Sequence, residues 1–261
     1  MRCRLFALAA PCAALCLVSG ATVAAQCSRT STEATNALVE LYTSEGCNSC
    51  PPADAWLSRL RSSGHGAAIG LAFHVDYWDY IGWKDPFARA EHTTRQRWLA
   101  QVNRSRAVYT PQVVVNGRDF RRWYDTNEVK SRIQATRQMP ARARLDLHLD
   151  ATGSEVLARL SGQVQLTRDR NEVGIFLVVY ESNLRSRVTA GENNGTDLRH
   201  DYVVRALHGP FVPEASGVIE WSKALRLDSN WKRADIGVVA FVQSRASGDV
   251  YQAIDLPLCQ G

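Results

Sequence analysis

The sequence of 261 residues lacks the features that define several classes of protein. Beyond the N-terminus, no apolar run is long enough to cross a bilayer, so we expect no membrane span. The formal net charge is only +5, and the Lys and Arg residues are scattered instead of forming a stripe. This charge pattern lacks the basic patch or stripe of a nucleic-acid-binding protein. The chain also lacks low-complexity tracts and internal repeats, and its 45% hydrophobic content is that of an ordinary packed protein.

Cysteine is scarce, and what is missing around it is informative. Cys47 and Cys50 form the one Cys-x-x-Cys motif among seven cysteines, so no second pair completes a four-cysteine zinc site. The residue after Cys50 is Pro51, whereas c-type haem attachment requires a histidine there. These two absences favour a redox-active dithiol over a zinc or haem site.

The surroundings of this motif also agree with redox chemistry. The apolar run 37–42 predicts a buried strand, and Pro51 suits the first turn of a helix. Unpaired backbone N–H groups and the positive end of the helix dipole stabilise a thiolate at such a position. We therefore predict a catalytic dithiol in which Cys47 exchanges first and Cys50 resolves the mixed disulfide.

The N-terminus has the pattern of a signal peptide. Arg2 and Arg4 precede an apolar stretch over residues 5–18, and the small residues Val23-Ala24-Ala25 follow it. We expect cleavage after Ala25, which removes residues 1–25 as the signal peptide. The product is then periplasmic or secreted.

Export would leave four cysteines in an oxidising compartment, where disulfides form and persist. These are Cys27, Cys47, Cys50 and Cys259. The economical pairing joins Cys47 to Cys50 and Cys27 to Cys259, the latter as a structural disulfide near the two ends of the mature chain. Four cysteines allow three pairings, so the other connectivities stay open at this point.

Hydrophobic periodicity divides the remaining chain into two parts near Pro140. Residues 26–140 alternate strands and helices in the order β-α-β-α-β-β-α, which is the order of the thioredoxin fold. The expected segments are 37–43, 53–60, 67–75, 91–104, 112–115, 119–124 and 126–139. Residues 141–261 instead show short alternating runs separated by turn clusters, which is typical of an antiparallel sandwich. We predict an α/β thioredoxin-like domain followed by an all-β sandwich-like domain.

Three longer stretches carry a family resemblance. They are LVELYTSEGCNSCPPAD at 38–54, LAFHVDYWDYIGWKDPF at 71–87 and YTPQVVVNGR at 109–118. These stretches resemble a group of exported bacterial thioredoxin-like proteins catalogued as domain of unknown function 1223. The resemblance implies a thioredoxin-like fold and a dithiol site, and it supplies no substrate. It also implies that Pro111 is cis and that the Thr110 backbone faces Cys47 and Cys50 across a substrate groove.

The aromatic and acidic segment 74–86 is an insertion relative to ordinary thioredoxins, and it has two interpretations. It follows a predicted parallel strand, at the sheet edge where α/β folds place their ligands. In the functional interpretation, the substrate groove is lined by Tyr77, Trp78 and Trp83. His74 or Asp76 then tunes the thiols. In the alternative, the aromatic side chains dock the C-terminal domain.

Glu40 interrupts the apolar strand that precedes the motif. A buried carboxylate at this position has a raised pKa and can pass a proton to the resolving thiol. An outward-facing side chain on the same strand is the alternative.

We therefore expect an exported thiol–disulfide oxidoreductase that acts on a protein or small-molecule thiol or disulfide. It needs no cofactor besides its redox-active disulfide, and the sequence identifies neither its redox partner nor the direction of exchange. One alternative is a non-catalytic module that binds a ligand or partner and contains a structural disulfide. The other is a copper or zinc protein whose ligands are Cys47, Cys50 and His74.

Overall fold

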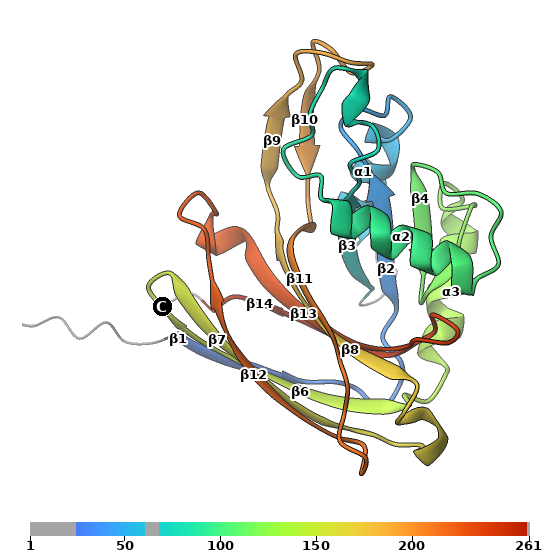
Figure 1. Ribbon diagram of the computed structural model, residues 1–261, viewed down its shortest axis with the longest axis vertical. Helices are drawn as coiled ribbons and strands as arrows, with labels where there is room; N and C mark the ends of the chain where they lie inside the picture. Colours follow the sequence, from blue (N-terminus) through green and yellow to red (C-terminus); the bar gives the residue numbers. More distant parts are fainter. Residues whose placement is uncertain (1–24, 61–67, 260–261) are drawn as a thin grey trace, which may run out of the picture.

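The computed structural model describes residues 25–60 and 68–259 (Figure 1). In Figure 1 the helices gather at one end of a long sheet, and a second sheet packs against the other end. Apart from Ala25, the predicted signal peptide lies outside the described residues. Within the described part of the chain, no helix is long and apolar enough to cross a membrane.

Eight strands form one mixed sheet in the order β14-β13-β8-β11-β3-β2-β4-β5. Within this sheet, β2 and β3 run parallel, β4 runs antiparallel to β2, and β11 runs parallel to β3. The strands are β2 (Leu38–Thr43), β3 (Ile69–His74), β4 (Gln112–Val115), β5 (Arg118–Asp119), β8 (Val173–Glu181), β11 (Val203–Phe211), β13 (Ile236–Ser244) and β14 (Val250–Pro257).

Three α-helices cover both faces of the sheet around β2. Successive side chains of a strand point to opposite faces. On one face, Leu57 of α1 and Ile133 of α3 join the buried cluster that contains Leu41. On the other face, Leu99 of α2 joins the cluster that contains Tyr42. The helices are α1 (Pro51–Leu60), α2 (Ala90–Val102) and α3 (Thr126–Arg137).

The predicted strand over 119–124 is wrong beyond its first residue, since β5 comprises only two residues. The chain turns at Arg122, whose carbonyl accepts a hydrogen bond from the Asp125 N–H at 3.0 Å. The Asp125 side chain then caps α3 by accepting from the N–H groups of Asn127 and Glu128. Because the turn leads directly into this helix cap, no strand continues past Asp119.

A second sheet of order β1-β6-β7-β12 packs against the C-terminal strands of the first. Leu147 of β6 and Leu160 of β7 share one buried core with Leu177 of β8 and Val238 of β13. Along β6, buried residues alternate with less buried ones, because only one face of the strand meets this core. The strands are β1 (Ala25–Thr30), β6 (Ala143–Thr152), β7 (Glu155–Val164) and β12 (Val218–Arg226).

One continuous sheet joins the two parts of the chain that periodicity divides near Pro140. Val203 of β11 pairs with Ala72 of β3, and the Ala72 N–H donates to the Tyr202 carbonyl at 2.8 Å. In the second sheet, β1 from before the division pairs with β6 from after it. The predicted boundary thus separates two kinds of sequence pattern, while strand pairing crosses it in both sheets.

The expected disulfide between Cys27 and Cys259 is present, with Cα atoms 5.8 Å apart and a sequence separation of 232. It links β1 to the segment that follows β14. A bridge that closes so long a loop stabilises the fold by about 5 kcal/mol in the chain-entropy model. This pairing is structural.

A buried ion pair connects the helical end of the molecule to the C-terminal strands. Arg95 of α2 donates to both carboxylate oxygens of Glu40, at 2.7 and 2.9 Å. The Tyr42 hydroxyl donates to the same carboxylate, and Arg95 also donates to Gln243 of β13. The guanidinium lies 5.0 Å from the ring centroid of Phe241. Glu40 is 1% exposed, so the alternative of an outward-facing side chain is wrong.

Replacing Arg95 with methionine should lower the free energy of unfolding by about 3–5 kcal/mol, because Glu40 is then buried without its cation. Urea unfolding followed by tryptophan fluorescence measures this loss. The double variant Arg95→Met, Glu40→Gln should recover part of it, since no unpaired charge remains. Equal losses in the single and double variants would contradict charge compensation as the reason.

Candidate functional site

Cys47 and Cys50 form a disulfide between the end of β2 and the start of α1. The Cys50 carbonyl accepts hydrogen bonds from the N–H groups of Ala53 and Asp54, which builds the first helical turn directly onto the motif. The Ser49 hydroxyl lies 3.3 Å from the Cys47 sulfur. Cys47 is 1% exposed and Cys50 is fully buried, whereas the residues between them are exposed. The disulfide therefore lies just beneath the surface of the protein.

A loop from the C-terminal part of the chain lies against the turn that carries this disulfide. It connects β9 (Leu184–Arg187) to β10 (Asp197–His200), a two-stranded hairpin that lies beside α1 (Figure 1). The Asn193 side chain donates to the carbonyls of Glu45 and Cys47, at 2.8 and 3.1 Å. The Asn48 N–H donates to the carboxylate of Glu192 at 3.1 Å. These contacts hold residues 188–196, called the cover loop below, against the Cys-x-x-Cys turn.

Trp78 links the cysteine turn to the strand-entry proline. Its indole N–H donates to the Thr110 hydroxyl at 2.8 Å. A Cβ atom added at Gly46 would lie 3.0 Å from the Trp78 Cβ, so the backbone of Trp78 lies close to this turn. The Thr110–Pro111 peptide bond is cis, as predicted.

Tyr77 and Trp78 also pack against the buried cluster that contains Phe176 and Phe241 of the C-terminal strands. The same cluster contains Phe73 of β3 and Val114 of β4, so this packing does not distinguish the two interpretations of the insertion. Because Trp78 in addition contacts Thr110, the same segment reaches both regions. Burial raises the pKa of the Tyr77 hydroxyl above its ordinary value.

The three residues predicted to tune the thiols lie in different places. Asp76 is bound by the Thr93 hydroxyl of α2 at 2.5 Å. Glu40 shares its face of β2 with Tyr42, on the side of the sheet that α2 covers and α1 does not. His74, fully buried at the end of β3, belongs to a polar network that extends to the cysteine turn. The structure therefore brings His74, and neither Asp76 nor Glu40, into that network.

Glu45 is the centre of this network and was missed from the sequence. Its carboxylate accepts from His200 Nε2 at 3.0 Å and from Trp83 Nε1 at 2.8 Å. Its backbone N–H donates to Asp85, which also binds His74 Nδ1 at 2.7 Å. Glu45 stands two residues before Cys47, within the stretch 38–54 that carries the family resemblance. This nearness to the cysteine was the one signal in the sequence that could have identified it. Its partners come from distant segments, which no local pattern reveals.

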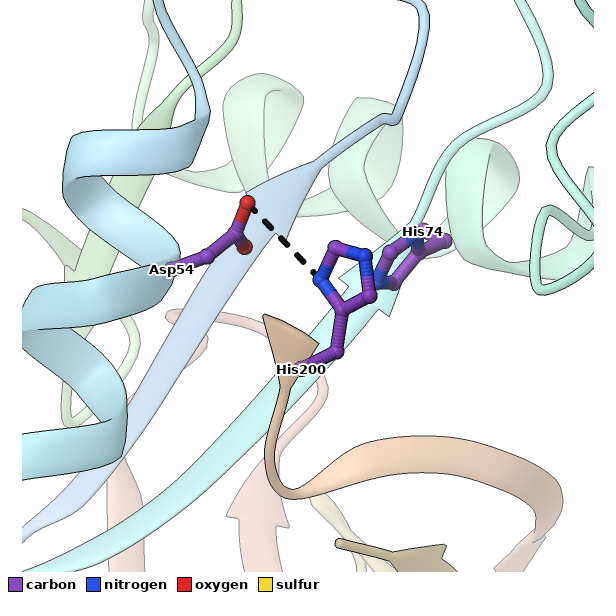
Figure 2. Close-up of side chains that lie close together, drawn as sticks. All are labelled: Asp54, His74 and His200. Carbon is purple, nitrogen blue, oxygen red and sulfur yellow. Dashed lines mark ion pairs between the residues drawn. The ribbon is translucent and has the colours of Figure 1, made fainter. Parts of the chain in front are cut away.

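Asp54, His74 and His200 lie close together (Figure 2). Asp54 lies on α1 one turn after Cys50, His74 ends β3 and His200 ends β10. One ligand atom from each of the three lies within 4.8 Å of the other two. His200 belongs to the second half of the sequence, far along the chain from the other two residues. The alternative metal site of Cys47, Cys50 and His74 concerns the reduced protein and stays a prediction, because the two sulfur atoms are bonded to each other in this structure.

Burial and charge shift the pKa values of this cluster in opposing directions. Burial raises the pKa of Asp54, and the nearby His200 and His74 only partly offset that effect. Burial lowers the pKa of His74, but Asp85 beside it more than compensates, so the pKa stands above its ordinary value. For Asp85, burial acts upward and His74 acts downward, and the pKa is lowered.

A mixed α/β protein with a covered Cys-x-x-Cys disulfide is the class that this geometry defines. The chain belongs to the family described as Protein of unknown function (DUF1223), whose model matches residues 38–243. This match confirms the family resemblance drawn from the motifs. A search of curated proteins found no match.

Two solved structures are similar to this chain. One is a protein from Agrobacterium tumefaciens determined by X-ray crystallography in a structural genomics programme. It is 27% identical, with a TM-score of 0.61 over 86% of this chain and 95% of that one. The other is HBP35 of Porphyromonas gingivalis, 16% identical, with a TM-score of 0.66 over 87% of this chain and 76% of that one. At this identity the likeness to HBP35 shows the fold alone.

Replacing Asn193 with alanine should speed the reduction of the Cys47–Cys50 disulfide by dithiothreitol by roughly 10-fold or more. The variant loses two hydrogen bonds that hold the cover loop closed, each contributing about 1 kcal/mol. Timed alkylation followed by mass spectrometry measures the rate. The exposed neighbour Asn194, changed to alanine, serves as the matched control and should leave the rate unchanged. Identical rates in both variants would contradict a covering role for Asn193.

Proposed function

We propose that this protein is an exported thiol–disulfide oxidoreductase that acts through Cys47 and Cys50. The observation that carries the proposal is the position of this disulfide, between a buried strand and the first turn of α1. Backbone N–H groups and the helix dipole at that turn stabilise the thiolate released on reduction. The Ser49 hydroxyl, 3.3 Å from the Cys47 sulfur, offers a further hydrogen bond to it.

The arrangement of the surrounding elements supports a thioredoxin-like unit. Along the chain, the elements β2, α1, β3, α2, β4, β5 and α3 follow the expected order β-α-β-α-β-β-α. In the sheet, β2 lies between its parallel partner β3 and its antiparallel partner β4. Pro111, with its cis peptide bond, precedes β4. In this proposal, Thr110 and Pro111 shape the groove that receives an extended substrate, and Trp78 supports Thr110.

The proposed exchange transfers two electrons in two steps. In the oxidising direction, a substrate thiolate attacks the Cys47 sulfur, the bond to Cys50 breaks, and Cys50 leaves as a thiolate. A second substrate thiolate then attacks the substrate sulfur of the mixed disulfide, and Cys47 leaves as a thiolate. The substrate gains a disulfide and the protein holds the dithiol. Reduction of a substrate follows the same steps in reverse.

Access to Cys47 requires the cover loop to move. With 1% of Cys47 exposed, an attacking thiolate has no path to its sulfur in the described arrangement. The loop is held by hydrogen bonds from Asn193 and to Glu192, which are replaceable by water when it opens. The substrate class in this proposal is a protein or small-molecule thiol or disulfide.

Export is part of the same proposal and follows from the cysteines and the N-terminus. All four cysteines outside the predicted signal peptide are paired in two disulfides. Such pairing is compatible with an oxidising compartment, either the periplasm or the exterior of the cell. The signal peptide assigned to residues 1–25 provides the route.

The burial of the disulfide favours a second candidate function. In this alternative the disulfide is structural, and the protein binds a ligand or partner without redox chemistry. A bond between two cysteines that are at most 1% exposed is the observation in its favour. The two functions differ in whether the Cys47–Cys50 bond opens in glutathione buffers of physiological potential.

Replacing Cys47 with serine should abolish thiol–disulfide exchange with an external dithiol substrate, because the attacked sulfur is gone. Exchange is measured with a fluorescent disulfide-bonded peptide. Equilibration of the unaltered protein against graded glutathione, read by thiol-trapping mass spectrometry, should give a reduction potential within about −120 to −270 mV. The Cys27–Cys259 bond is the internal reference and should remain closed. Exchange at full rate in the serine variant, or a Cys47–Cys50 bond that never opens, would support the second candidate instead.

A further inference from the structure

We propose that Asp54, His74 and His200 bind one divalent transition-metal ion, for which Zn²⁺ is the first candidate. The three side chains come from α1, β3 and β10 and lie close together (Figure 2). All three are at least nine-tenths buried. This site contains no cysteine, so it is distinct from the dithiol and does not depend on the proposed redox function.

Each of these side chains has a buried polar atom without a hydrogen-bond partner. The atoms are Asp54 Oδ1, His74 Nε2 and His200 Nδ1. Buried polar groups in folded proteins nearly always have a partner, and each exception requires an explanation. Here three exceptions occur in one cluster whose ligand atoms lie within 4.8 Å of one another. An ion bound between these side chains would give a partner to the two imidazole nitrogens and to the Asp54 carboxylate.

The remaining nitrogen of each histidine fixes which atom is free to bind. His74 Nδ1 lies 2.7 Å from Asp85, and His200 Nε2 lies 3.0 Å from Glu45. A carboxylate only accepts hydrogen bonds, so both of these nitrogens carry protons. In the neutral rings, His74 Nε2 and His200 Nδ1 then present lone pairs. A histidine that donates its second N–H to a carboxylate is the usual arrangement of a metal ligand.

Charge balance points to a cation in the same place. Asp54, Asp85 and Glu45 bring three carboxylates into a region where each residue is at most 7% exposed. Imidazoles that bind a metal ion are neutral, so in the metal-bound protein the histidines do not offset the charge of these carboxylates. Buried charges without a partner are costly, so a divalent ion between Asp54 and the two rings offsets the negative charge.

A direct hydrogen bond is a weaker explanation for the cluster. Between His200 Nδ1 and the carboxylate of Asp54 the distance is 4.0 Å, which is longer than a hydrogen bond. The rings of His74 and His200 are nearly perpendicular, with centroids 4.9 Å apart, and do not bond to each other through their free nitrogens. A proton on any one of the three atoms therefore leaves the others unsatisfied.

The donor set indicates the kind of metal. Two imidazole nitrogens and one carboxylate oxygen suit Zn²⁺ and other first-row divalent ions, whereas Ca²⁺ and Mg²⁺ prefer oxygen alone. Three protein ligands leave a coordination position for a small non-protein ligand. His200 also lines a surface cavity of about 550 Å³ beside β9 and β10, which offers a route of approach. The ion would tie α1 and β3 to the hairpin that carries the cover loop.

The test uses untagged protein that is freed of metal with a chelator and dialysed into buffer. Titration with Zn²⁺, followed by calorimetry and elemental analysis, should give one tightly bound ion per chain. Asp54→Asn keeps an oxygen for the Thr43 hydroxyl, and His200→Gln keeps an N–H for Glu45, so both are conservative. Each should weaken Zn²⁺ binding by at least about 100-fold, since each removes a direct ligand rather than an outer-shell partner.

Two control variants separate this site from other sources of binding. The double variant Cys47→Ser, Cys50→Ser should retain one Zn²⁺ per chain even if the redox proposal fails. His208→Gln, which changes a half-buried histidine of β11 outside the cluster, should also retain it. The Co²⁺-loaded unaltered protein should show visible absorption bands without a sulfur-to-cobalt band in the near ultraviolet. This spectrum supports the proposal even where a variant fails to fold.

Three results would overturn the proposal. One is the absence of stoichiometric Zn²⁺ or Co²⁺ binding by the unaltered protein. The three side chains would then share only protons, without a metal ion. The second is binding that survives in folded Asp54→Asn and His200→Gln proteins. The third is loss of binding in the double cysteine variant together with a sulfur-to-cobalt band, which would assign the metal to the thiolates.

Discussion

The pairing of β11 with β3 is the constraint on which the rest of this structure depends. Without it, the backbone on one side of β3 would lack partners, and buried N–H and C=O groups must be paired. The register places Val203 against Ala72, and β10 ends three residues earlier in the chain at His200. The hairpin β9–β10 is therefore delivered beside α1. One strand pairing thus positions both the cover loop and the third member of the buried Asp–His–His cluster.

The cysteine turn lies between two polar layers that come from different parts of the chain. On its outer side, Asn193 of the cover loop binds the carbonyls of Glu45 and Cys47. On its inner side, the Glu45 carboxylate binds His200, and Asp54 follows Cys50 by one helical turn. Both layers contact Glu45, so a substitution in either one alters the hydrogen bonds of a residue two positions before Cys47. The proposed metal site and the proposed dithiol are therefore neighbours that use separate atoms.

The boundary between the helical end and the strand-only part is held by charge as well as by apolar packing. Arg95 reaches from α2 across to Gln243 of β13 while it binds Glu40 of β2. Phe176 and Phe241 lie against its guanidinium, so the cation is desolvated and depends on Glu40. This explains why a glutamate occupies the interior of a buried strand. It also separates Glu40 from the cysteines, which lie toward α1.

The sequence by itself determined the features that depend on neighbouring residues. The Cys-x-x-Cys at the start of α1, the strands β2 and β3 and the family all follow from local spacing, periodicity or motif. The Cys27–Cys259 pairing was expected from the number of cysteines outside the signal peptide, and the structure selected it among the three possible connectivities. The short strand β5 and the Asp125 cap of α3 are also local features. The sequence prediction was wrong after Asp119, because a turn stands where a strand was expected. Only the tertiary structure decided that Asp54, His74 and His200 meet, and that Asn193 binds the Cys47 carbonyl. The physical reason is that strand pairing between distant segments brings these residues together, and no periodicity within a single segment encodes such a contact.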